Sequence, residues 1–579
     1  MNRVTSKRSW LTAAASLVMA SGCATVSANQ AAYDKSQLYA DFVRGRYASL
    51  RADSASSAAY YQEALKRAPN DQEILERAVT RTLIAGDVRA AAAIERAAEK
   101  SGATTALGQL AVAADALVRG DFRARKDAAA PMDPAGPFNQ VISSSIKAWS
   151  QAGAGDVDGA TTYLRAASSG STLDRLNDYQ IAMIYDYAGR PKEALENYER
   201  AWKSGLRLAV NVDAYGKLLE RQGNYDQAIG VYQEFIDTVG ANPTIQASLN
   251  RAKARTPAAP KISGPAQGAA ISIFGPAAAL TAQSGGEQAA SYLQLALHLD
   301  PKLDAARTLL AAGKAEAGRT EDSIDALRAV SPDSPYFTTA RIEMMWALAR
   351  LDKNAEAVSA AEETAQLAPS QQTRLALADL HRSLEHWAEA EKIYNAEISA
   401  NPPKDDPETA RIYFSRGAVR ERLNRWPDAE ADLLKALEMA PNDADVLNYL
   451  GYSWVDRGEN IEKAIDLIER AVALQPESGF IVDSLGWAQY KLGRYEEATA
   501  TLENAVELAP GEATINDHLG DAYWQIGRRI EARFQWTRTL SLKPSEAERT
   551  SAEAKLKNGL PPHAAKTVAT EAAKTGVKR

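Results

Sequence analysis

The sequence predicts an all-α protein, an α-solenoid (superhelix) of about 11–12 stacked helix pairs. Two observations predict this fold class. Helical segments of nearly the same amino-acid sequence follow one another toward the C-terminus. Prolines end these segments at intervals of 35, 34 and 34 residues: Pro441, Pro476, Pro510 and Pro544. A period near 34 residues is typical of solenoids, because one helix pair leaves much of its apolar surface exposed until a neighbour stacks on it.

Small residues recur at fixed positions within each period. Glycines recur on the first helix, at Gly417, Gly451, Gly486 and Gly520. Alanines recur on the second helix, at Ala429, Ala464, Ala498 and Ala532. Side chains this small let two paired helices approach closely, while larger residues such as Leu450 and Leu502 fill the space between neighbouring pairs. Turn glycines at Gly458, Gly493 and Gly527 stand where a left-handed backbone is expected.

These residues resemble the tetratricopeptide repeat. The family pattern has Leu-Gly and an aromatic residue on the first helix, a Gly-containing turn, two alanines flanking a large residue on the second helix, and a closing proline. The segment LGWAQYKLGRYEEATATLENAVELAP, residues 485–510, matches it at nearly every position. Looser copies extend backward, so the resemblance implies tetratricopeptide-like helix pairs over residues 38–544.

Composition shifts divide the repeats into two predicted arrays. Residues 253–287 are rich in Ala, Pro and Gly, and 253–270 are predicted to form a linker because no polar helical face appears there. The linker would separate a degenerate N-terminal array, 38–252, from a C-terminal array, 271–549. Residues 550–579 are predicted to form a capping helix followed by a mobile tail.

The N-terminus has the layout of a secretory signal peptide, predicted at residues 1–22: basic residues, a short apolar run, then small residues. Cys23, the only cysteine of the chain, follows directly. The stretch resembles a bacterial lipobox, in which the cysteine becomes the acylated first residue, and residues 23–37 would then be a lipid-anchored tether. Ala20 stands where leucine is commoner, which leaves cleavage by the ordinary signal peptidase as the alternative.

The resemblance to bacterial lipoproteins also implies a location. Residue 24 is alanine and not the aspartate that is linked to retention in the inner membrane. The expected location is therefore the periplasmic face of the outer membrane. No later stretch reaches the 18 or so continuous apolar residues of a membrane span. A single cysteine cannot form an intrachain disulfide, so we expect the fold to depend on packing alone.

Composition and motifs argue against nucleic-acid binding and catalysis. The formal net charge is −7, whereas a nucleic-acid surface needs an excess of cations. Of the five histidines, only His381 and His386 are close in sequence, and they lack the i, i+4 spacing of a metalloprotease helix. We read them as a helix-surface and a turn residue. The sequence predicts no metal, no cofactor and no enzymatic activity.

The repeat family implies where partners would bind. In this fold the residues that flank the Leu-Gly pair on the concave side are the usual peptide contacts. The predicted partner-binding residues are Asn448, Tyr452, Asp483, Trp487, Tyr490, Lys491, Asp517, Asp521 and Trp524, with Asp445, Asp456, Phe480 and Gln525 beside them. Rigid aromatic rings bury a large area at little entropic cost. Lys491 stands nearly alone among acidic neighbours, which disfavours recognition of an acidic C-terminus.

The overall organisation resembles repeat lipoproteins of the periplasm that bind a carboxyl-terminal processing protease and deliver cell-wall hydrolases to it. The likeness is carried by LNYLGYSWVDR, DSLGWAQYKLGRYEEA and NDHLGDAYWQIGR together with Cys23. It implies a non-catalytic scaffold. Two alternatives stay open: a repeat lipoprotein of an envelope assembly, secretion or polysaccharide-export machine, and, last, a hydrolase domain hidden near 104–140 or 253–287.

Overall fold

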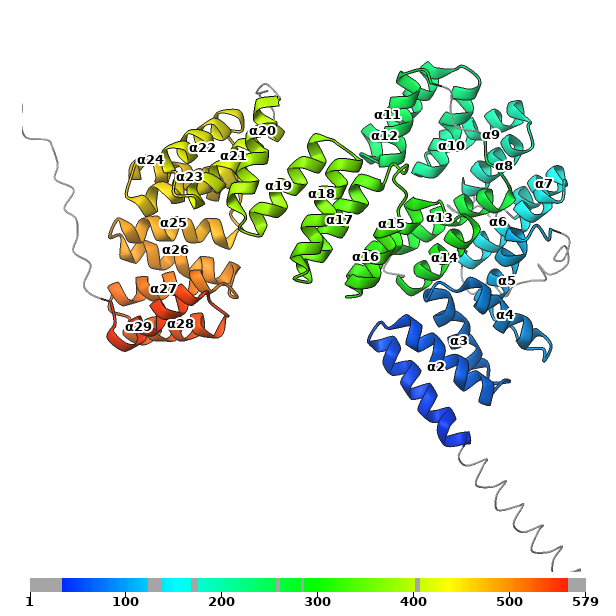
Figure 1. Cartoon of the computed structure of the whole chain (residues 1–579), viewed down its shortest axis with the longest axis horizontal. Coiled ribbons are helices and arrows are strands. Elements are labelled where there is room, and N and C mark those ends of the chain that lie inside the picture. The colour runs from blue at the N-terminus through cyan, green and yellow to red at the C-terminus, as the bar shows by residue number, and fades with distance from the viewer. Residues whose placement is uncertain are drawn as a thin grey trace, which may run out of the picture. The chain divides into compact units, whose positions relative to one another are not determined.

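The computed structural model describes residues 34–122, 137–167, 175–256, 261–282, 286–400 and 407–560. Every regular element in these residues is a helix, which confirms the predicted all-α solenoid class (Figure 1). The chain divides into two compact units, Met1–Ala368 and Pro369–Arg579. The predicted signal peptide, Cys23 and the predicted tail beyond residue 560 lie outside the described residues.

Unit 1 begins with a helix over residues 34–50. Its further helices are α2 (Ser54–Arg67), α3 (Gln72–Ile84), α4 (Val88–Glu99), α5 (Ala106–Val118), α6 (Pro137–Gly153), α7 (Val157–Ala166), α8 (Arg175–Tyr187), α9 (Pro191–Lys203), α10 (Ala209–Arg221), α11 (Tyr225–Val239), α12 (Pro243–Lys253), α13 (Pro265–Ala282), α14 (Gly286–Leu299), α15 (Asp304–Glu316), α16 (Thr320–Arg328), α17 (Phe337–Arg350) and α18 (Asn354–Leu367).

Unit 2 holds the regular repeats. Its helices are α19 (Gln371–Ser383), α20 (Trp387–Ala400), α21 (Pro407–Arg422), α22 (Trp426–Met439), α23 (Ala444–Arg457), α24 (Ile461–Leu474), α25 (Gly479–Lys491), α26 (Tyr495–Leu508), α27 (Ala513–Gln525), α28 (Arg529–Ser541) and α29 (Glu546–Asn558). Each odd-numbered helix up to α27 packs against the even-numbered helix that follows it.

Glycine sets the distance between paired helices in unit 2. A Cβ atom built on Gly451 would lie 2.7 Å from Ile468 Cγ1, and one on Gly486 would lie 2.6 Å from Leu502 Cγ. On Gly520 it would lie 2.5 Å from Trp536 Nε1. These distances are shorter than ordinary contacts between non-bonded atoms. The recurring glycines therefore permit the close helix packing that the sequence predicts.

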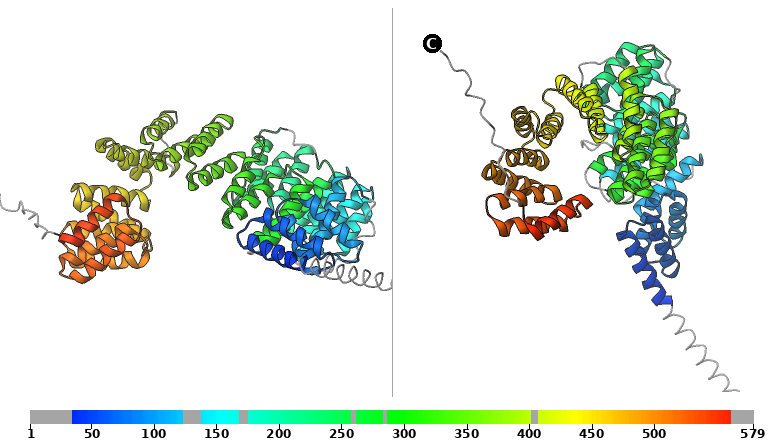
Figure 2. Two further views of the ribbon diagram at one scale, coloured as in Figure 1. Left: turned by 60° about the horizontal axis from the view of Figure 1, so that its bottom comes forward. Right: turned by 60° about the vertical axis from the view of Figure 1, so that its left-hand side comes forward.

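The first helices of successive repeats lie side by side. Helix α23 contacts α25, α25 contacts α27, and α27 contacts α29 (Figure 1 and Figure 2). Apolar side chains fill small clusters in series along unit 2, as expected when each repeat packs on its neighbours. The layer of first helices carries the predicted partner-binding residues.

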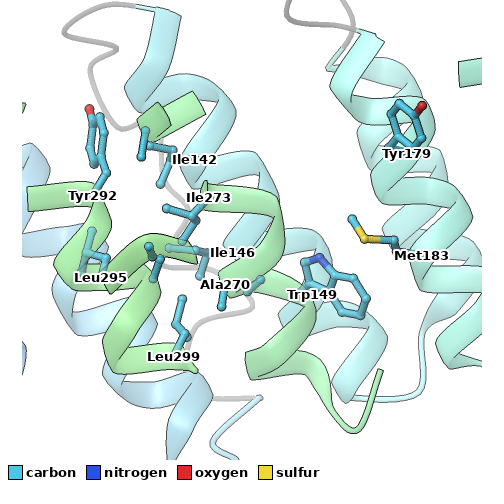
Figure 3. Close-up of a cluster of buried hydrophobic side chains, with 14 of the residues drawn as sticks. Ile142, Ile146, Trp149, Tyr179, Met183, Ala270, Ile273, Tyr292, Leu295 and Leu299 are labelled. Carbon is cyan, nitrogen blue, oxygen red and sulfur yellow. The ribbon is translucent and has the colours of Figure 1, made fainter. Parts of the chain in front are cut away.

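Unit 1 has one large core, built differently from a simple stack. Helices α13 and α14 pack against the earlier helices α6 and α5, and α14 also contacts α3. Trp149 of α6 is completely buried, and its Nε1 donates a hydrogen bond of 3.0 Å to Ser272 Oγ of α13. Figure 3 shows Ala270 and Ile273 of α13 together with Ile146 of α6 and other buried apolar side chains.

The units do not meet at the predicted linker. Helix α12 ends at Lys253, but α13 begins at Pro265, so residues 265–270 are helical. Ala269 and Ala270 are fully buried in the core of unit 1, although the stretch has no polar face. A helix that contacts protein on most of its sides needs little polar surface. The division between the compact units lies instead after Ala368.

Candidate partner-binding surface

The first helices α23, α25 and α27 place the predicted residues on one layer, but only some of them face solvent. Asp445, Asp456 and Lys491 are exposed, and Asn448, Tyr452 and Trp487 are half-buried. Asp483, Tyr490 and Asp521 are buried. The exposed fraction of Phe480 is 57%, which is high for an aromatic side chain. The accessible part of the predicted surface thus lies mainly on α23 and α25.

Asp483 forms a buried ion pair between neighbouring repeats. Both of its carboxylate oxygens lie 3.0 Å from Nδ1 of His518 on α27. Burial lowers the pKa of His518, but the carboxylates of Asp483, Asp517 and Asp521 outweigh it and raise the pKa above its ordinary value. Asp483 therefore joins α25 to α27, and its carboxylate is not presented to a partner.

Trp487 is the centre of an aromatic group on α25. Its ring stacks on His518 at a centroid distance of 4.0 Å and on Tyr490 at 4.8 Å. Lys491 Nζ lies 5.0 Å from the centroid of Trp487, within cation–π range, and 3.7 Å from Asp456. The stacking holds the indole ring in one orientation while leaving it partly exposed, which suits a binding contact.

Tyr452 and Asn448 adjoin this group on α23. Burial, followed by the negative charges of Asp456 and Asp483, raises the pKa of Tyr452 to about 12, so its phenol stays protonated and can donate a hydrogen bond. Asn448 Oδ1 is buried and has no hydrogen-bond partner in the described part of the chain.

The last repeat is covered by the chain's own helix α29. Lys555 Nζ lies 2.5 Å from Asp517 Oδ2 and 2.8 Å from Asp521 Oδ1. Trp524 Nε1 donates a 2.8 Å hydrogen bond to the carbonyl of Leu560, just beyond α29. The predicted binding residues Asp517, Asp521 and Trp524 consequently have an intramolecular partner in this structure.

Sequence reasoning missed two residues of this layer. His518 precedes the Leu-Gly pair of its repeat, and this position alone could have indicated a contact with the preceding first helix. Lys555 lies beyond the last repeat, where the repeat pattern gives no position for it. The interpretation of His381 as a surface residue is corrected, because its side chain is buried on α19 with its Nδ1 3.3 Å from Nδ1 of His386.

Neither a metal-binding cluster nor a membrane-crossing helix is present among the described residues. No group of three or more His, Cys, Asp or Glu residues in them is arranged to hold a metal ion. Among the same residues, no helix combines the length and the apolar character that crossing a membrane requires.

The tetratricopeptide repeat model matches residues 179–244, 375–444, 416–479 and 484–547. The matched segments are therefore similar to tetratricopeptide repeats, and they lie in both units. The chain is 34% identical, over 95 residues, to a TPR repeat-containing protein of Pseudomonas aeruginosa. This similarity covers 16% of either chain.

The matching solved structures are more distant in sequence. Tom70 of yeast is 15% identical, with 72% of this chain and 95% of that chain covered and a TM-score of 0.37. A chain of the APC/C hetero-tetramer Cut9-Hcn1 is 15% identical, with 92% of this chain and 98% of that chain covered and a TM-score of 0.38. A tetratricopeptide repeat protein of Parabacteroides merdae is 16% identical, with 44% and 97% covered and a TM-score of 0.36.

Proposed function

We propose that the protein is a non-catalytic scaffold that binds protein partners on the exposed part of the first-helix layer of unit 2. The observation that carries this proposal is the set of oriented, partly exposed side chains on α23 and α25, centred on Trp487 and Tyr452. Aromatic rings held by stacking lose little entropy on binding, and exposed carboxylates and Lys491 around them supply a polar rim. Tetratricopeptide repeats support protein–protein interaction in general.

We further propose that the scaffold is anchored by acyl chains on Cys23 to the periplasmic face of the outer membrane. The signal-peptide layout and the single cysteine behind it support this location. Each buried methylene contributes about 0.8 kcal/mol, so several acyl chains hold a protein at a membrane far longer than one chain does.

The finer function that we propose is to tether and activate a carboxyl-terminal processing protease that degrades cell-wall hydrolases. The support is the resemblance of the last three repeats, with Cys23, to adaptors of such proteases. Docking protease and substrate on one body would raise their effective concentration, and binding only the active protease assembly would increase its population. The alternative partner is an envelope assembly, secretion or polysaccharide-export machine.

Photocrosslinking in intact cells tests both the proposed binding surface and the proposed identity of the partner. A photoreactive residue replaces Trp487 or Tyr452, and a matched control replaces Phe534 of α28, which is 65% exposed on a second helix. We expect positions 487 and 452 to capture a periplasmic processing protease or a cell-wall hydrolase, and position 534 to capture neither. Capture of export components alone would favour the alternative. Equal capture at all three positions would contradict the proposed surface.

A further inference from the structure

Unit 1 contains a cavity that the scaffold function does not use. Its volume is about 420 Å³, and it lies between helices α2 and α3 on one side and α14 and α15 on the other. Apolar walls come from Ile84, Leu293 and Leu310. Small-molecule pockets typically measure about 300–1,000 Å³ and combine apolar walls with a few polar groups. The cavity therefore has the size and lining of a ligand site.

Two cations that line this cavity, beside the exposed Glu316, have no short ion pair with a carboxylate. Lys314 Nζ donates only a long hydrogen bond of 3.4 Å, to the carbonyl of Asp322, and no carboxylate of the described residues is within ion-pair distance of it. Burial lowers the pKa of Lys314 below its ordinary value. Arg319 donates to Ser54 Oγ at 2.6 Å and lies 3.6 Å from the Asp322 carboxylate, but its Nε is buried without a partner.

A third cation at the cavity, Arg81, differs from these two because a carboxylate of the chain pairs with it. Both of its terminal nitrogens bond the carboxylate of Glu287, at 2.6 and 3.0 Å. That guanidinium is neutralised within the chain. An anion entering the cavity would therefore find at Lys314 and Arg319 cations that no carboxylate bonds closely, whereas Arg81 already bonds Glu287.

We propose that this cavity binds an anionic amphiphile. Its carboxylate or phosphate group meets Lys314 and Arg319, and its hydrocarbon part lies against Ile84, Leu293 and Leu310. The two cations supply charge-assisted hydrogen bonds for the head group, and the apolar walls remove the hydrocarbon from water. A neutral amphiphile would gain only the second of these contributions, and a cationic one would be repelled.

Gly313, which also lines the cavity, offers a way to close it. A Cβ built on this residue meets no atom within 4 Å, so a large side chain can enter open space without displacing the core. Gly230 on α11 has the same open surroundings but does not line the cavity. Gly313→Phe and Gly230→Phe therefore form a matched pair for testing occupation of the cavity.

Calorimetric titration of the full chain with sodium decanoate, decyl phosphate and decanol tests the proposal. Cys23→Ser removes the predicted acylation site, so that detergent, itself an amphiphile, can be left out. We expect at least one of the two anions to bind about tenfold or more tightly than decanol, since a charged hydrogen bond contributes roughly 1.5–3 kcal/mol. The anion that binds distinguishes a carboxylate from a phosphate head group.

The variants decide whether binding occurs in this cavity. Lys314→Met should weaken anion binding about tenfold or more and leave decanol unchanged, whereas the exposed Lys353→Met should change neither. Gly313→Phe should abolish binding and Gly230→Phe should not. Arg319→Gln provides a second test of the head-group contact if Lys314→Met unfolds. Failure of both anions to bind, equal binding of decanol, or anion binding unaffected by Lys314→Met and Gly313→Phe would overturn the proposal.

Discussion

At the scale of single residues, charge pairs between neighbouring first helices join the repeats of unit 2. His518 binds Asp483 of the preceding repeat, and Lys555 binds Asp517 and Asp521. His518, Asp483 and Asp521 are buried and Lys555 and Asp517 are largely covered, so each depends on its partner: removing one member leaves an uncompensated charge. The predicted partner-binding carboxylates Asp483 and Asp521 therefore act within the fold.

The Asp483–His518 pair predicts a pH-dependent stability. The pKa of His518 is raised in the folded state above its ordinary value of 6.5. Its stabilising contribution is therefore complete below about pH 6.5 and falls as the pH rises through the folded-state pKa. Urea unfolding of the wild type and His518→Gln should show a difference in free energy that shrinks toward alkaline pH. A difference that grows over this range would contradict the assignment.

Close packing at the repeat glycines predicts a second residue-scale effect. The methyl group of Gly486→Ala would clash with Leu502, so we expect the free energy of unfolding of unit 2 to fall by about 1–3 kcal/mol, the usual cost of overpacking. Gly511→Ala is the control, because a Cβ at that turn meets no atom within 4 Å. The midpoint of urea unfolding measures both. Equal midpoints for the two variants would argue against the helix contact.

At the scale of elements, α29 takes the place that the first helix of another repeat would occupy. It begins with a capping box, in which Ser545 and Glu548 satisfy each other's backbone N–H groups. It covers the apolar side of α27, and Leu556 and Leu560 pack with Trp524 in the terminal cluster. A solenoid needs such a helix because its last repeat would otherwise expose its core.

Lys555 is expected to hold this capping helix in place. Lys555→Met would leave the two carboxylates of Asp517 and Asp521 without their cation, and breaking a buried pair in this way costs about 3–5 kcal/mol. Lys557→Met is the matched control, since Lys557 is exposed on the same helix. Hydrogen exchange should speed up in α27 and α29 for Lys555→Met alone. Unchanged exchange in both variants would contradict the proposed role.

At the scale of the whole molecule, the two units have separate apolar cores. The core of unit 1 runs from Leu75 to Leu310 and includes α13 and α14, whereas unit 2 has its own series of clusters. Two cores of this kind can unfold in separate transitions, for which a single free energy of unfolding is not defined.

A change at Gly268 tests this independence. A Cβ at Gly268 would lie 2.3 Å from the ring of Trp149, so Gly268→Ala should lower the melting temperature of unit 1 by several degrees through overpacking. Gly486→Ala should lower only the transition of unit 2. Scanning calorimetry of both variants measures the two effects. If either variant shifted both transitions equally, the units would be thermodynamically coupled.

The regular repeats could be predicted in detail because their information is local. The fold class, the close approach at Gly451, Gly486 and Gly520, and the left-handed turn at Gly493 follow from residues within one period. The candidate surface could be predicted only in part. Repeat position places Trp487 on the correct layer, but it does not show that His518 covers the Asp483 carboxylate.

The sequence by itself determined the period, the helix pairs and the identity of the small residues between them, since each depends on neighbours within about 34 residues. Only the tertiary structure decided which side chains remain accessible. Packing of α13 and α14 against helices more than 100 residues earlier made residues 265–270 part of a core. Docking of α29 through Lys555 covered the last repeat. The first contact joins segments that no periodic pattern relates, and the second involves a helix beyond the last recognisable repeat, so burial depended on what the fold brings next to a residue.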